Sequence, residues 1–152
     1  MKLAVALQER KDLNEKINQL SYRLNMNSIV QEGESSQENT EDLLKELDEC
    51  LKELEHLICR INITNCNTLT NYNNLTLTEL IAKKDMLTLK INKYRDLVNN
   101  ASNLISRVSR SEIKVISNVD VKKTQKQIDL MSKELRIIEN TIQETNWLIE
   151  LQ

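Results

Sequence analysis

Apolar residues recur every three or four positions in four separate stretches of the chain. This period of about 3.5 residues puts them on one side of a helix, as in the seam of a coiled coil. The chain has no proline and one glycine, so helices can be long. The four seams are Leu3, Ala6, Arg10, Leu13, Ile17, Leu20 and Leu24; Leu44, Leu47, Leu51, Leu54, Ile58, Ile61 and Asn65; Leu87, Ile91, Tyr94, Val98, Ala101, Ile105 and Val108; and Val121, Thr124, Ile128, Met131, Leu135, Ile138, Ile142, Thr145 and Ile149.

The seams predict a mainly all-α fold, an antiparallel four-helix bundle whose helices are each about 25 to 30 residues long. Other apolar residues flank the seams, and a two-stranded coil would not need them. They are Leu43, Cys50 and Leu57 beside the second seam and Leu130, Ile137 and Leu148 beside the fourth.

Polar residues mark where the helices begin. Thr76 and Glu79 have the spacing of a capping box, in which each side chain accepts a hydrogen bond from the other's backbone. The other candidate N-caps are Asn39 or Thr40 for the second helix and Asn118 or Asp120 for the fourth.

The length of 152 residues favours one helical domain over residues 1–152. An internal repeat suggests an alternative. KELEHLICRINITN (52–65) and KELRIIENTIQETN (133–146) share Lys-Glu-Leu, an Ile and Thr-Asn at identical spacing. The chain is then two helix–strand–helix repeats, 1–67 and 76–152.

One stretch favours a strand. RSEIKVISNVDV (110–121) is rich in β-branched residues, and a strand needs a partner for its backbone. In an up-down-up-down bundle the first and third links lie at the same end, so we expect residues 112–118 to pair with 28–32. This predicts a small two-stranded β element at one end, covered by a second subunit. The predicted oligomer interface is Ile29, Val30, Ile113, Val115, Ile116 and Trp147.

Composition restricts the class of function. The net charge is −2 and aromatic residues make up 3%, so we do not expect nucleic-acid binding. No apolar run approaches the roughly 18 to 20 residues that span a bilayer, and the N-terminal LAVAL is too short for a signal peptide. Three cysteines, an odd number, suggest reduced thiols. We therefore expect a cytoplasmic protein.

Catalytic and metal-binding motifs are missing from the sequence. There is no glycine-rich phosphate loop, and His56, the single histidine, has no evident nucleophile to activate. His56 and Cys59 share a helix face, but Cys66 lies two turns further on, so we expect no zinc site. We expect no enzyme activity and no cofactor.

Several polar residues occupy positions near one end of the predicted bundle. They are Arg10, Lys84, Asn65, Thr145 and Asn146. One interpretation is a pocket for an anion or small ligand. The other, which we favour, is a polar layer that fixes helix register, with Arg10 and Lys84 reaching acids such as Glu139 or Glu55.

Four segments together resemble the septicolysin-like family of small bacterial proteins, over nearly the whole chain. They are RSEIKVISNVDV, IQETNWL, RINITN and LTELIAKKDML. The resemblance implies a membrane-active cytolysin, and it carries no catalytic residues to this chain.

Three functions follow from these patterns. The first is a self-assembling structural or interaction protein, whose partner is another copy of itself. The second, implied by the resemblance, is a cytolysin that acts on membranes. The third is a small-ligand or anion binder that uses the polar layer.

Overall fold

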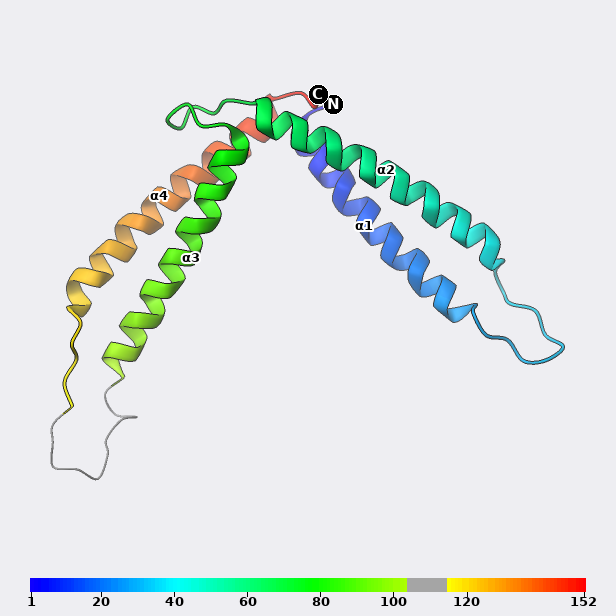
Figure 1. Cartoon of the computed structure of the whole chain (residues 1–152), viewed down its shortest axis with the longest axis horizontal. Helices are drawn as coiled ribbons and strands as arrows, with labels where there is room; N and C mark the ends of the chain where they lie inside the picture. Colours follow the sequence, from blue (N-terminus) through cyan, green and yellow to red (C-terminus); the bar gives the residue numbers. More distant parts are fainter. Residues whose placement is uncertain (104–114) are drawn as a thin grey trace. The chain divides into compact units, whose positions relative to one another are not determined.

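The computed structural model describes residues 1–103 and 115–152, which contain four α-helices (Figure 1). They are α1 (Leu3–Met26), α2 (Thr40–Asn67), α3 (Leu77–Ser102) and α4 (Val121–Leu148). Their lengths are 24, 28, 26 and 28 residues. The prediction of an all-α protein with four long helices is confirmed.

The predicted caps define three of the helix starts. The Asn39 side chain accepts a hydrogen bond from the backbone N–H of Glu41 at 2.9 Å. Thr76 and Glu79 form the capping box in both directions. Asp120 accepts from the backbone N–H of Lys123 at 2.9 Å. Each cap satisfies an N–H that the first helical turn leaves without a partner.

The chain forms two compact units, which are described separately. Unit 1 comprises residues 1–68 and 145–152, and unit 2 comprises residues 69–144. In unit 1, α1 and α2 run antiparallel, side by side; in unit 2, α3 and α4 do the same (Figure 1). The contacts thus group the helices in pairs, whereas the sequence predicted one set of four. The assignment of 1–152 as one domain, or as two repeats, stays a prediction.

The core of unit 1 lies between α1 and α2. Leu20 of α1 packs with Leu43 and Cys50 of α2, and Ile17, Leu24 and Leu47 cover them. The buried residues of α2 are Leu43, Cys50, Leu57, Ile61 and Thr64. Most of them were predicted to flank the seam, so the predicted seam of α2 is displaced by one residue.

The two ends of the chain meet in unit 1. Leu3 donates its backbone N–H to the carbonyl of Ile149 at 2.9 Å, and Leu151 donates to the carbonyl of Met1 at 2.8 Å. The N–H of Gln152 donates to Thr64 Oγ1 at 2.9 Å, beside the buried Leu151. These bonds hold residues 149–152 against α1 and the end of α2.

Unit 2 begins with a tight turn, residues 69–76. The backbone N–H and the hydroxyl of Thr70 both donate to the carbonyl of Leu75, at 2.8 and 2.9 Å. Asn73 and Asn74 have φ values of 51° and 54°, a left-handed conformation that asparagine tolerates better than most residues. After the turn, α3 and α4 bury Leu77, Leu80, Ile91, Ile128 and Ile138.

The predicted β element is not found in the described residues. Residues 28–32 and 115–118 form no strand, and residues 112–114 lie outside the described part. The pairing assumed that all four helices pack in one bundle, which would bring the two links together. Since the links belong to different units, that argument no longer applies.

Candidate functional site

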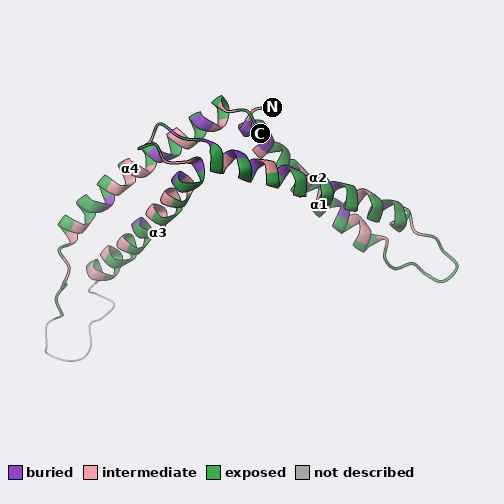
Figure 2. Cartoon of the chain, turned by 45° about the horizontal axis from the view of Figure 1, so that its top comes forward, coloured by how far each residue is buried: buried purple, intermediate pink, exposed green. Residues whose placement is uncertain are grey.

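α2 carries a second apolar stripe beside the one that packs on α1. Leu44, Leu51 and Ile58 are spaced by seven residues and are 50%, 45% and 37% exposed. Each follows a buried residue of the core by one position, so the stripe lies about 100° further around the helix. We call these three residues the α2 outer stripe. Figure 2 shows the buried and exposed residues along α2.

Acidic residues surround the α2 outer stripe. α2 has seven acidic side chains and three basic ones. Asp48 and Glu55 lie on the stripe itself, because the series 44, 48, 51, 55, 58 advances by four and three residues alternately. Both carboxylates are exposed. The stripe is therefore an apolar surface with negative charges placed within it.

α3 has a comparable exposed face. Met86, Leu89 and Leu97 are 61%, 49% and 46% exposed, and Lys93 lies among them at helical spacing. These four residues are the α3 outer face. α3 has five basic side chains and three acidic ones, so its charge is opposite to that of α2.

The exposure of these two faces differs from the sequence prediction. Leu44, Leu51 and Ile58 were assigned to a bundle seam, and Met86, Leu89 and Leu97 were overlooked. A second series with steps of three and four residues, at positions 86, 89, 93 and 97, runs beside the Leu87 seam. It is the sequence signal that could have revealed the α3 outer face.

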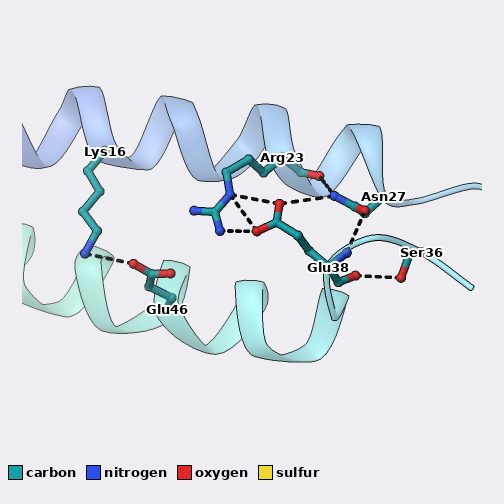
Figure 3. A network of polar contacts seen from close by, with 6 residues as sticks. All are labelled: Lys16, Arg23, Asn27, Ser36, Glu38 and Glu46. Carbon is teal, nitrogen blue, oxygen red and sulfur yellow. Dashed lines mark hydrogen bonds and ion pairs between the residues drawn. The ribbon is translucent and has the colours of Figure 1, made fainter.

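The link between α1 and α2 is built on an ion pair (Figure 3). Arg23 Nε donates to both carboxylate oxygens of Glu38, at 3.2 and 3.1 Å, and its Nη2 also contacts Glu38. Asn27 Oδ1 accepts from the Glu38 backbone N–H at 3.1 Å. The guanidinium lowers the pKa of Glu38 from its ordinary value. These contacts fix the end of the α1–α2 hairpin.

A second polar cluster joins the 69–76 turn to α4 in unit 2. Tyr72 donates its hydroxyl to Glu134 Oε1 at 2.8 Å, and Lys83 Nζ lies 3.0 Å from the same oxygen. Lys83 also lies 5.2 Å from the centre of the Tyr72 ring. The hydrogen bond to the Glu134 carboxylate raises the pKa of Tyr72. The cluster therefore ties the turn to α4.

The predicted polar layer is divided between the two units. Arg10, Asn65, Thr145 and Asn146 lie in unit 1, and Lys84 lies in unit 2. Arg10 is exposed, although it occupies a seam position. Lys84 pairs with the adjacent Asp85 at 3.1 Å, rather than with Glu139 or Glu55. Thr145 is buried, and Asn65 and Asn146 are half-buried. A ligand pocket formed by these residues stays a prediction.

The predicted interface residues are exposed wherever the structure describes them. Ile29 and Val30 help to line a hollow of about 310 Å³ in the α1–α2 link. Val115 and Ile116 help to line another of about 320 Å³ in unit 2. Trp147, near the end of α4, is 65% exposed. Ile113 lies outside the described residues.

The described residues contain no group of three or more His, Cys, Asp and Glu side chains arranged to hold a metal ion. Cys50 is buried in the α1–α2 core, whereas Cys59 and Cys66 are exposed. Among residues 1–103 and 115–152, no helix combines the length and the apolar character needed to cross a membrane.

Comparison with known proteins corrects the septicolysin-like resemblance. Residues 10–151 match the model of a family of unknown function, DUF6847. The segments behind the resemblance are mostly heptad-patterned, and such helices imitate one another. No curated protein matches the chain.

A solved structure supports the fold over the full length. A functionally unknown conserved protein from Corynebacterium diphtheriae has 36% sequence identity and a TM-score of 0.90, covering 100% of this chain and 99% of that chain. Together with the family match over residues 10–151, this places the chain in DUF6847, a family of unknown function.

Proposed function

We propose that the protein is a self-assembling interaction protein without enzymatic activity, and that a second copy covers the α2 outer stripe. The observation that carries the proposal is the exposure of Leu44, Leu51 and Ile58 at seven-residue spacing. Exposed apolar residues are common singly, but a regular stripe along 14 residues of helix, about 21 Å, is typical of a helix–helix contact.

Half-buried residues extend the apolar surface between the core and the α2 outer stripe. Leu47 and Leu54 lie along the border between the two stripes. α1 covers only one side of this wide apolar surface, so another helix is needed to remove the rest from water. Burial of such surface contributes roughly 25 cal/mol per Å², which favours association.

The exposed thiols suit a reducing compartment, so we place the assembly in the cytoplasm. Cys59 and Cys66 lie on the exposed side of α2. In an oxidising compartment such thiols are prone to form disulfides between copies.

The experiment measures the mass of the protein in solution, by light scattering and sedimentation, over a wide concentration range. We expect oligomers at tens of micromolar. Leu51→Glu should weaken association by roughly tenfold or more, since it introduces a charge into an apolar contact. Ile63→Glu is the matched control, because Ile63 is 52% exposed on the same helix but lies away from the stripe.

Two results would contradict the proposal. One is a wild-type protein that stays monomeric throughout the concentration range. The other is an oligomer that Leu51→Glu and Ile63→Glu affect equally, which would locate the contact elsewhere.

A further inference from the structure

The α2 outer stripe carries two charges that no residue in the described part of the chain neutralises. Asp48 and Glu55 alternate with Leu44, Leu51 and Ile58 along the stripe. Among the described residues, neither carboxylate has an ion-pair partner within 4.0 Å. A helix that covers the stripe must therefore face both carboxylates, and a cation on that helix would stabilise the contact.

A second α2 is a poor occupant of this surface. Two α2 outer stripes packed together would bring Asp48 and Glu55 of one copy against the same residues of the other. α2 as a whole has more than twice as many acidic as basic side chains. Like charges facing each other across an interface disfavour association.

The α3 outer face has the complementary pattern. Met86, Leu89 and Leu97 equal in number the three apolar residues of the α2 outer stripe. Lys93 lies among them, as Asp48 and Glu55 lie among the apolar residues of α2. In the described part of the chain, Lys93, like the two carboxylates, takes part in no salt bridge.

α4 offers a weaker match. Its exposed apolar residues at seven-residue spacing are Leu130 and Ile137, and the next position in that series is Glu144. This face is shorter than the α2 outer stripe, and it continues into an acid that would meet the acids of α2. α3 is therefore the better partner on both apolar length and charge.

We infer that the α3 outer face of one copy covers the α2 outer stripe of another, with Lys93 facing the carboxylates of Asp48 and Glu55. The inference rests on the proposed function, since it names the partner surface for the same self-association. The contact pairs an acidic helix with a basic one, and none of its three charged side chains has an ion-pair partner among the described residues.

Two charge-reversed chains test the inference. One carries Lys93→Glu, and the other carries Asp48→Lys with Glu55→Lys. All three positions are exposed, so both chains should keep the helical circular-dichroism signal of the wild type. Each chain alone would place like charges at the contact, which should raise its dissociation constant about tenfold to a hundredfold.

Mixing the two chains supplies the decisive result. In the mixture, the acidic α2 of the first chain can meet the unchanged Lys93 of the second. The lysine-bearing α2 of the second chain can meet the glutamate that Lys93→Glu introduces into the first. We expect the mixture to associate nearly as tightly as the wild type, which sedimentation of one fluorescently labelled chain with the other unlabelled would show.

The other outcomes separate this inference from the proposed function. If wild type associates and Lys93→Glu associates equally well, the α3 outer face is not the partner, although self-association stands. If each chain alone is weakened and the mixture shows no recovery, opposite charges across copies do not form the contact. If wild type itself does not associate, the proposed function fails first.

Discussion

The α1–α2 link and the 69–76 turn are held by different forces. Between α1 and α2, the link depends on side chains, with Arg23 and Glu38 as an ion pair and Asn27 beside them. The 69–76 turn depends on the backbone, with bonds between Thr70 and Leu75 and the capping box that follows. Loss of the ion pair should therefore weaken the first, and changes in backbone preference or capping should weaken the second.

Core packing should contribute more to the free energy of unfolding than the ion pair of the link or the capping box of the turn. Leu20→Ala removes a side chain that is 1% exposed in unit 1, and Leu80→Ala removes one that is 0% exposed in unit 2. We expect each to lower the free energy of unfolding by roughly 2 to 5 kcal/mol, since each leaves a cavity. Urea unfolding followed by circular dichroism measures both.

The control for this pair is Ile29→Ala, whose side chain is 87% exposed and should contribute little to the core. If the core variants lost less stability than variants of the capping box or of the ion pair, local contacts rather than core packing would dominate the stability of both units.

Loss of the capping box should have the next largest effect. Thr76→Ala removes the hydroxyl that accepts from the Glu79 backbone N–H, and it leaves the Glu79 carboxylate with one of its two hydrogen bonds, the one from the backbone N–H of residue 76. We expect a loss of about 0.5 to 2 kcal/mol in the free energy of unfolding, with little dependence on pH near neutrality. Asn99→Ala, in the same helix but away from the cap, should not lower stability. Equal losses from both variants would count against the role of the cap.

The ion pair of the α1–α2 link should give the smallest effect, and an acid-dependent one. Because Arg23 lowers the pKa of Glu38 in the folded chain, the pair stabilises fully above the unfolded pKa of about 4.3 and is lost as the pH falls through the lower, folded pKa. Wild type should thus exceed Glu38→Gln in stability at neutral pH. That difference should shrink below about pH 4.

Thermal unfolding at a series of pH values checks this prediction. Glu34→Gln is the control, because Glu34 is an exposed acid of the same link. If the difference between wild type and Glu38→Gln stayed constant from neutral pH to below about pH 4, the Arg23–Glu38 ion pair would not be what stabilises this link.

The sequence predicted local structure more reliably than packing. Thr76 with Glu79, Asn39 and Asp120 lie where the caps were expected, because a cap depends on residues within one turn of itself. The predicted pairing of a 112–118 strand with 28–32 is not found in the described residues, since it depended on how distant links meet. The sequence pattern identified the apolar residues of the α2 outer stripe, but it did not predict that they are exposed.

The reason is clearest along α2. The sequence by itself determined that residues 40–67 form an amphipathic helix with two adjacent apolar series, Leu43, Cys50 and Leu57, and Leu44, Leu51 and Ile58. Both series repeat every seven residues, and they differ by a rotation of about 100° around the helix. Neither the period nor the helix propensity therefore indicates which series is buried. Only the tertiary structure decided that the first series faces α1 and leaves the second in water, because Leu20 packs with Leu43 and Cys50.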